Sequence, residues 1–319
     1  MRLLAGFVAL ACLAACQSAP EVATSDGSDP IVTTSAAPTS ITLPAETFEL
    51  SWRQLDQHLS RDGRFAAKHV DEWVVVTRDG KEFGRFGTAV DRIIGMDFSP
   101  DGHYLAVAHP DTVIAYDLTT KRPKALFTPP LESIRFSADS THLVGREHYQ
   151  KVRNGRLGVI DIATGKWVAS PVPPQIEVSN DPGSYWYSGS LAVFDQGRQA
   201  VAAGSDGFLH WAVESQQLTW VPCGCGADTG AVDRAGSRVA LVIPDNRLTL
   251  WDVASRREQR VWALPERPPL NGDHQLRYFG VEPHFTEDGK WLLLDGGEGG
   301  QVWSIPDGVR VTVPPRSRN

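Results

Sequence analysis

The sequence predicts an all-β fold assembled from one repeated unit, and three observations support this prediction. Short apolar runs, many of them alternating with polar residues, recur along the chain between clusters of turn residues, as is typical of strands. The chain contains 10 tryptophans and only 2 methionines, which suits a rigid β structure better than an adaptable helical one. A two-residue turn also returns at a nearly constant interval, which is the signature of a repeat architecture.

The recurring turn lies between two apolar strands in each unit. The six turns are Asp62-Gly63, Asp101-Gly102, Asp139-Ser140, Gln196-Gly197, Ala235-Gly236 and Asp288-Gly289. Their second residues are separated by 39, 38, 57, 39 and 53 positions. We interpret the long intervals as one repeat of about 39 residues with inserts at 170–188 and 264–277. Asp-Gly between strands predicts a tight hairpin, because glycine accepts the positive φ that such a turn requires.

Each unit continues in the same way after its turn. A second strand is followed by another turn residue, and a third strand then carries a bulky apolar residue. These residues are Val76, Tyr116, Ile160, Trp211, Trp251 and Trp303, and an aspartate follows directly in Tyr116-Asp117, Ile160-Asp161 and Trp251-Asp252. A fourth strand completes the unit, and four short strands in about 40 residues match the period of one propeller blade.

The repeat therefore predicts a six-bladed β-propeller, with seven blades as the alternative. The blades span about 50–86, 90–127, 131–169, 189–221, 229–262 and 278–313. A seventh blade would have to lie in the inserts, which are too short for four strands. We expect closure through a blade that contains both chain ends, with Ile41–Leu43 and Val309–Val313 as candidate strands.

The chain resembles the WD-repeat β-propellers and is identified as a divergent bacterial member. The resemblance is best between Ile94 and Leu118, which contain Phe-Ser-Pro-Asp-Gly at 98–102, Leu-Ala-Val at 105–107 and the pair Tyr116-Asp117. It covers most of residues 50–313, but the family's Gly-His pair is missing and Trp-Asp survives only at Trp251-Asp252. We therefore do not expect the family's Asp-His-Ser-Trp network in most blades. The resemblance implies structural roles within the blades for Tyr116, Asp117, Trp211, Trp251, Asp252 and Trp303.

The N-terminal segment has the features of an export signal. Met1-Arg2 precedes an apolar run that ends in Leu13-Ala14-Ala15-Cys16, and this run is shorter than the roughly 20 residues that span a bilayer. The ending resembles the lipobox of bacterial lipoproteins. That resemblance implies cleavage before Cys16, acylation of its thiol and attachment to a membrane. Gln17 resembles the residue that directs sorting to the outer membrane in Gram-negative bacteria. The alternative is an ordinary signal peptide that is cut elsewhere.

Three regions follow from these features: a signal peptide at 1–15, a lipidated cysteine with a flexible stalk at 16–46, and a propeller at 47–319. The stalk is rich in Ser, Thr, Ala and Pro, and such a segment buries too little apolar surface to offset its ordering entropy. At about 5–6 Å × √n for a flexible chain, it would hold the propeller roughly 25–35 Å from the anchor.

The formal net charge of −7 without a long basic run predicts that nucleic acid is not a partner. Beyond Cys16, the only cysteines that follow the signal are Cys223 and Cys225, so a buried core must hold the fold. We expect a disulfide between this pair, although closing one across a single residue is strained. Free thiols and a metal or redox site are the alternatives.

Catalytic and cofactor motifs are not evident in the sequence. The 9 histidines are scattered without the spacing of zinc ligands, and no nucleophile elbow or phosphate-binding glycine loop is present. Val159–Trp167 is similar to the Asp-x-x-Thr-Gly-x-x-x-Trp docking motif of quinoprotein propellers, but we interpret it as a turn that begins at Asp161. We therefore predict neither a metal nor a cofactor.

The inserts that break the repeat are the candidate interaction surface. Both inserts and the Cys223/Cys225 connection lie between the fourth strand of one blade and the first strand of the next, which places them on one face of a propeller. The first insert contains Tyr185, Trp186 and Tyr187, and exposed aromatic residues are enriched at interface hot spots. Alternatively, these aromatics fold back over a blade edge.

Together these features predict a non-catalytic, lipid-anchored propeller that serves as a scaffold for an envelope protein. The alternative is a propeller enzyme, quinone-dependent or hydrolytic, with its site in the central channel.

Overall fold

The computed structural model describes residues 41–42, 58–71, 73–87, 93–127, 131–147, 156–171, 191–204, 207–224, 229–243, 246–264, 283–294, 301–305 and 307–312. Residues 38–319 form one compact unit, and residues 1–37 lie outside the described residues.

The described residues of this unit form six sheets, each with four antiparallel strands in chain order. The first sheet contains β2 (His58–Leu59), β3 (Phe65–Val70), β4 (Trp73–Arg78) and β5 (Lys81–Phe86), and the second contains β6 (Gly95–Phe98), β7 (Tyr104–Ala108), β8 (Val113–Asp117) and β9 (Arg122–Phe127). The third contains β10 (Leu131–Phe136), β11 (His142–Glu147), β12 (Leu157–Asp161) and β13 (Trp167–Ala169), and the fourth contains β14 (Leu191–Phe194), β15 (Gln199–Gly204), β16 (Gly207–Ala212) and β17 (Gln217–Pro222). The fifth contains β18 (Thr229–Val232), β19 (Arg238–Ile243), β20 (Arg247–Asp252) and β21 (Arg257–Ala263), and the sixth contains β22 (Pro283–Phe285), β23 (Trp291–Leu294), β24 (Gln301–Ser304) and β25 (Arg310–Thr312).

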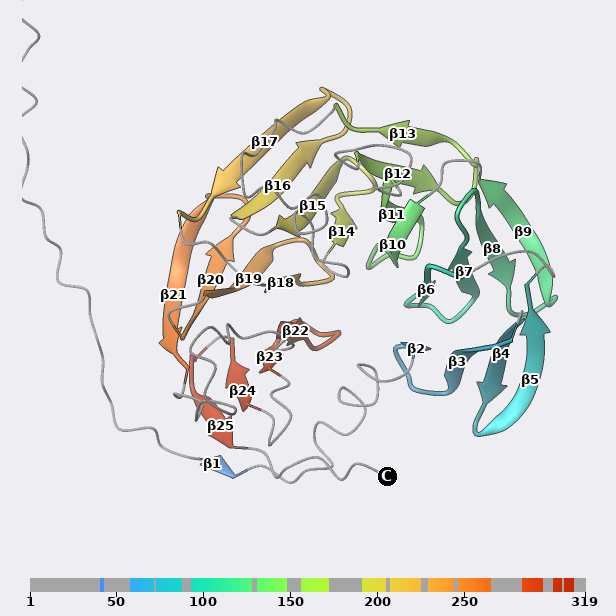
Figure 1. Ribbon diagram of the computed structural model, residues 1–319, viewed down its shortest axis with the longest axis horizontal. Coiled ribbons are helices and arrows are strands. Elements are labelled where there is room, and N and C mark those ends of the chain that lie inside the picture. The colour runs from blue at the N-terminus through green and yellow to red at the C-terminus, as the bar shows by residue number, and fades with distance from the viewer. Residues whose placement is uncertain are drawn as a thin grey trace, which may run out of the picture. The chain divides into compact units, whose positions relative to one another are not determined.

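The all-β prediction is confirmed, because every regular element in the described part of the chain is a strand. In the described residues no helix is long and apolar enough to cross a membrane. The first strands of consecutive sheets contact one another, and the sheets follow one another around a common centre with these strands innermost (Figure 1). This arrangement is compatible with a β-propeller. We call the centre the axis.

Both ends of the described chain meet in the sixth sheet. β1 (Ile41–Thr42) pairs with β25 in parallel, Ile41 opposite Val311 and Thr42 opposite Thr312. The sheet order is β1-β25-β24-β23-β22, so β1 is a fifth strand outside four that are already complete. β1 lies within Ile41–Leu43, which the sequence predicted as a candidate closing strand, and it pairs with the other candidate, Val309–Val313. It also lies within the segment 16–46 that was predicted to be the stalk.

The predicted turns share one geometry. The last turn residue has a positive φ in all six sheets: 70° at Gly63, 73° at Gly102, 63° at Ser140, 80° at Gly197, 68° at Gly236 and 67° at Gly289. In the second sheet, Ser99 Oγ donates to Asp101 Oδ1 at 2.5 Å and accepts from the Tyr104 amide at 2.8 Å. Ser60, Ser137 and Thr286 make the same pair of contacts in three other sheets.

The core lies between neighbouring sheets and is filled by residues of their middle strands. Trp211 on β16 is fully buried and packs with Val144, Leu157 and Val159 of the preceding sheet. Tyr116 on β8 and Trp303 on β24 occupy the same third-strand position and are also buried. Trp251 on β20 is only half-buried and meets Phe208 of the fourth sheet edge to face, at 6.2 Å between ring centroids.

Candidate functional site

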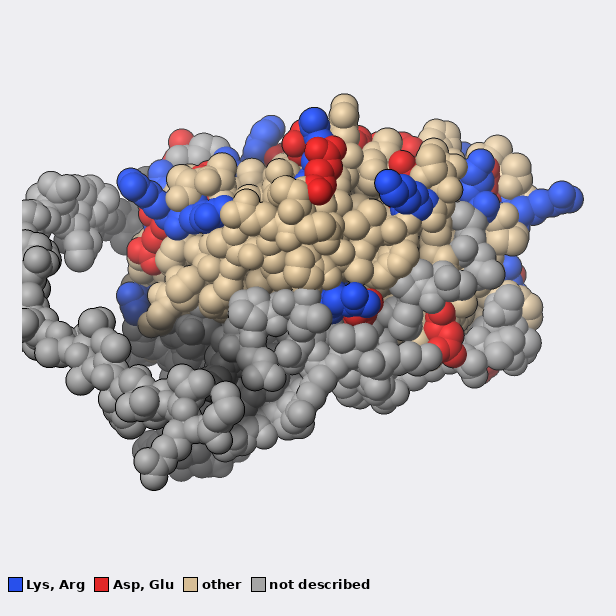
Figure 2. Space-filling view, turned by 90° about the horizontal axis from the view of Figure 1, so that it is seen from above, with Lys and Arg blue, Asp and Glu red and all other residues tan. Residues whose placement is uncertain are grey.

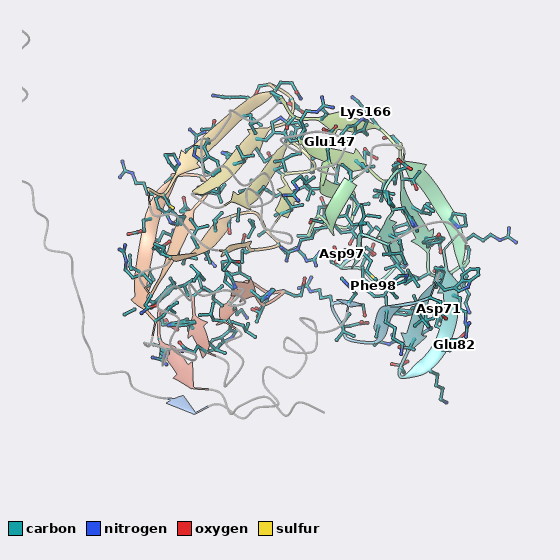
Figure 3. All side chains as sticks on the ribbon, viewed as in Figure 1. Asp71, Glu82, Asp97, Phe98, Glu147 and Lys166 are labelled. Atoms are coloured by element: carbon teal, nitrogen blue, oxygen red, sulfur yellow. The ribbon has the colours of Figure 1, made fainter. Side chains whose placement is uncertain are left out.

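Four charged side chains gather at the axis, where the innermost strands meet. We call them the axial cluster: Asp97, Arg135, Arg234 and Glu287. Figure 3 shows Asp97 near the centre, whereas Asp71, Glu82 and Lys166 lie at the periphery. The cluster draws on four sheets, since Asp97 and Arg135 lie on β6 and β10, and Arg234 and Glu287 lie in the β18–β19 and β22–β23 turns.

The local sequence explains how these side chains reach the axis. Asp97 and Arg135 each precede the buried phenylalanine that ends an innermost strand, Phe98 or Phe136. Successive residues of a strand point to opposite sides, so burying the phenylalanine turns the charged neighbour the other way. Arg234 follows the first residue of its turn, as Glu287 does one sheet later.

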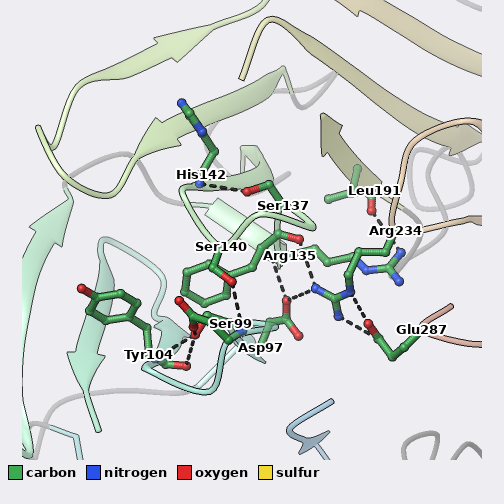
Figure 4. Close-up of polar contacts among 12 residues, drawn as sticks. Asp97, Ser99, Tyr104, Arg135, Ser137, Ser140, His142, Leu191, Arg234 and Glu287 are labelled. Carbon is green, nitrogen blue, oxygen red and sulfur yellow. Dashed lines mark hydrogen bonds and ion pairs between the residues drawn. The ribbon is translucent and has the colours of Figure 1, made fainter. Parts of the chain in front are cut away.

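Arg234 lies between the two carboxylates of the cluster (Figure 4). Its Nη1 is 3.3 Å from Asp97 Oδ2, and its Nη2 donates to Glu287 Oε1 at 3.0 Å. Nε is 2.6 Å from Glu287 Oε2, in an ion pair that is not aligned as a hydrogen bond. Nη1 also donates to the Phe136 carbonyl at 3.1 Å, and the Phe136 amide donates to Asp97 Oδ2 at 2.7 Å. One arginine of the fifth sheet thereby joins the second, third and sixth sheets.

Arg135 extends the same network to the fourth sheet. Its Nη1 donates to the Val232 carbonyl at 2.8 Å and to the Leu191 carbonyl at 3.2 Å. Leu191 begins β14 and Val232 ends β18. The axial cluster therefore contacts the innermost strands or first turns of five of the six sheets.

The charges of the cluster shift one another's protonation. Burial alone would raise the pKa of Glu287, but the positive charges of Arg234 and Arg135 outweigh it and hold this pKa below its ordinary value. Burial opposes the charge of Arg234, but Asp97 and Glu287 more than compensate and raise its pKa. Burial lowers the pKa of Arg135, and the neighbouring Arg234 adds to this effect. Glu287 therefore stays ionised and bound to Arg234 at neutral pH.

Two of the outermost strands in the first five sheets differ from the other three in charge. β5, β9 and β21 carry charged residues, namely Lys81, Glu82 and Arg85, then Arg122 and Lys124, then Arg257, Glu258 and Arg260. β13 and β17 contain only uncharged residues and include Trp167 and Trp220. Seen from above Figure 1, the molecule shows a broad band without charged side chains and with charges of both signs along its margin (Figure 2). We call β13 and β17 the uncharged edge.

The aromatic residues of the uncharged edge pack against the sheets behind them. Leu218 and Trp220 of β17 and Val168 of β13 contact the core between the third and fourth sheets. Trp167 lies so close to Gly158 that a Cβ at that position would be 1.9 Å from the indole ring. Glycine is thus required on β12 for this tryptophan to lie flat on its own sheet.

The aspartates that the sequence singled out begin turns. Asp117 Oδ1 accepts hydrogen bonds from the Thr119 and Thr120 amides, at 2.7 and 2.9 Å. Asp252 Oδ1 accepts from the amide and the hydroxyl of Ser255, at 2.7 and 2.6 Å. Asp161 accepts from the Thr164 amide at 2.8 Å, so the segment similar to the quinoprotein motif forms a turn between β12 and β13.

Several predicted site residues lie outside the described residues: Cys16, Tyr185, Trp186, Tyr187 and Cys225. Cys223 is described and forms a disulfide. Within the described ranges, no group of three or more His, Cys, Asp or Glu side chains is arranged to hold a metal ion.

The axial cluster was not predicted from the sequence. One signal could have revealed half of it: a single charge stands between apolar residues near the end of two innermost strands, in Met96-Asp97-Phe98 and Ile134-Arg135-Phe136.

No protein-family model matches this sequence, and a search of the curated proteins finds no match either.

Proposed function

We propose that this protein is a non-catalytic, lipid-anchored propeller that binds a protein partner in the cell envelope. The observation that carries the proposal is the uncharged edge. Sheet edges expose unpaired backbone donors and acceptors, and proteins usually protect them with charged residues. Charges protect β5, β9 and β21, whereas β13 and β17 have none. An extended segment of a partner could add to such an edge as a further strand.

The six sheets act in this proposal as six blades of a rigid scaffold. Contacts between the first strands of consecutive sheets support it, as does the shared turn geometry. The pairing of β1 with β25 brings both ends of the described chain into one sheet, which is the part of the expected closure that it supports.

The connection from β13 to β14 contains the predicted aromatic contacts Tyr185, Trp186 and Tyr187. In the sequence this connection directly follows an uncharged strand. We propose that these aromatics and the uncharged edge bind the same partner. The edge strands would form backbone hydrogen bonds with it, and the aromatic side chains would be buried against it as hot spots.

The enzyme alternative would use the polar groups at the axis. Both carboxylates of the axial cluster are already engaged by Arg234, and the lowered pKa of Glu287 does not suit a general acid at neutral pH. This geometry favours binding over catalysis.

Affinity capture from detergent-treated membranes tests the proposal with two matched variants. Thr219→Lys introduces a charge at the centre of β17, and Val261→Lys introduces the same charge on β21, where Val261 is 44% exposed. We expect Thr219→Lys to reduce partner recovery at least about tenfold, because an edge lysine opposes strand addition, and Val261→Lys to leave it unchanged. Replacing Tyr185, Trp186 and Tyr187 by serine should also abolish capture. Equal recovery by all variants, with unchanged melting temperatures, would refute the proposed surface.

A further inference from the structure

Arg135 differs from Arg234 in the axial cluster because none of the described carboxylates pairs with it. Arg234 has Asp97 and Glu287 within ion-pair distance. In the part of the chain that the structure describes, Arg135 has no carboxylate within ion-pair distance. Its strongest electrostatic neighbour is the like-charged Arg234, and Glu287, Asp97 and Asp233 act on it more weakly. A guanidinium remains protonated in proteins. Arg135 therefore brings to the axis a positive charge that forms no ion pair with the described residues.

The hydrogen bonds of Arg135 leave one edge of its guanidinium open. Nη1 donates to two backbone carbonyls, which uses both of its hydrogens. Nε and Nη2 have no acceptor among the described residues, and the Arg135 residue is partly exposed. These two nitrogens form the side edge of the guanidinium, and its two parallel N–H groups match the two oxygens of a carboxylate.

The surroundings fix the orientation of this open edge. The carbonyls of Leu191 and Val232 hold Nη1 from two different sheets, and Figure 4 shows the side chain reaching toward Leu191. Such a donor pair is ordered before any ligand arrives, so little conformational entropy is lost on binding. Asp97 and Glu287 are turned toward Arg234, and Asp233 accepts hydrogen bonds within its own turn from Ser237. These contacts offset much of the repulsion that the three carboxylates exert on an incoming anion.

We propose that Arg135 binds a carboxylate ligand at the axis, with Nε and Nη2 each donating to one carboxylate oxygen. The ligand is either a small free carboxylate or the acidic side chain of a partner. This site is independent of the uncharged edge, so either proposal can fail without the other.

Titration calorimetry on the purified full-length protein tests the site, with sodium acetate as the first probe and a blocked peptide containing one glutamate as the second. Sodium chloride at matched ionic strength is the control for general salt effects. We expect saturable binding that weakens at least about tenfold in Arg135→Gln, which keeps a donor for the carbonyls but loses the charge. Arg135→Lys should bind weakly, because it keeps the charge without the paired donors. A peptide that binds much more tightly than acetate assigns the ligand to a partner, and equal affinities assign it to a free carboxylate.

A second measurement needs no variant and covers the case in which Arg135→Gln does not fold. Crystals of the wild-type protein soaked in 4-bromobenzoate, whose aryl bromide does not alkylate side chains, should show bromine anomalous signal within several ångströms of the Arg135 guanidinium. Binding that is identical in wild type and Arg135→Gln, or bromine only at sites away from the axis, would overturn the proposal.

Discussion

The indole nitrogen of Trp251 donates a hydrogen bond to Thr249 Oγ1 at 3.1 Å. Trp211 occupies the same third-strand position one sheet earlier, is completely buried, and has no acceptor for its indole nitrogen among the described residues. Leucine at 209 stands where the fifth sheet has Thr249. Two tryptophans in equivalent positions thus differ in burial and in whether the indole N–H has a hydrogen-bond acceptor.

This difference predicts how the two positions respond to substitution. Trp211→Ala should lower the free energy of unfolding by about 3–5 kcal/mol, because it removes a large, fully buried aromatic. Trp251→Ala should lower the free energy of unfolding by less, since Trp251 is only half-buried. Trp211→Phe should cost much less than Trp211→Ala, because it also removes a buried donor without an acceptor. Urea denaturation measures all three, and a larger loss at Trp251 than at Trp211 would contradict this assignment of burial.

Glu287 makes stability depend on pH in the acidic range. The pKa of Glu287 is lowered in the folded protein. Its ionised form therefore adds to the free energy of unfolding in full at pH values above the unfolded-state pKa, and this stabilisation is lost as the pH falls through the folded-state pKa. We expect the unfolding free energy of the wild type to fall from about pH 5 downward, and the profile of Glu287→Gln to be flatter there. At pH 7 the variant should be less stable by about 1–3 kcal/mol, below the cost for a fully buried pair, because 21% of the Glu287 side chain is exposed. Parallel pH profiles for the two proteins would show that Glu287 does not contribute in this way.

The short strand β1 should protect the outer edge of the sixth sheet. Ile41→Pro removes a backbone donor and disfavours the paired conformation of the preceding residue. We expect faster hydrogen exchange at the amides of β25, with little change in the fifth sheet. Thr34→Pro, upstream of β1, is the matched control and should leave exchange unchanged. Unaltered exchange at β25 in Ile41→Pro would show that the pairing of Ile41 with Val311 is not stably formed.

The proposed lipid anchor can be tested by partitioning in a detergent that separates into two phases. The wild-type protein, expressed in a Gram-negative host, should enter the detergent phase. Cys16→Ser should remain unprocessed or stay in the aqueous phase, because it lacks the thiol that would be acylated. Equal aqueous partitioning of both forms would exclude lipidation at Cys16.

The sequence predicted those parts of the fold that depend on neighbours along the chain. The turns that end at Gly63, Gly102 and Gly236 could be aligned because each requires a positive φ. The third-strand position of Trp211 and Trp303 followed from its fixed distance after the turn. These features are local, so one repeat length was enough to locate them.

The axial cluster could not be found in this way, because it depends on how distant sheets meet. Asp97 and Arg234 are 137 residues apart, and no periodicity in the chain links an aspartate on β6 to an arginine in the β18–β19 turn. The uncharged edge was missed for a different reason. The composition of β13 and β17 is ordinary for strands, and it becomes informative only when both strands are known to be outermost in their sheets.

The pairing of β1 with β25 has a consequence for recombinant work on this protein. A fragment that begins at residue 47, where the sequence interpretation starts the propeller, lacks Ile41 and Thr42 and leaves the backbone of β25 uncovered. Uncovered edges promote self-association between molecules. A fragment that begins at residue 38 retains the covering strand, so the two should differ in aggregation even though both contain all six sheets.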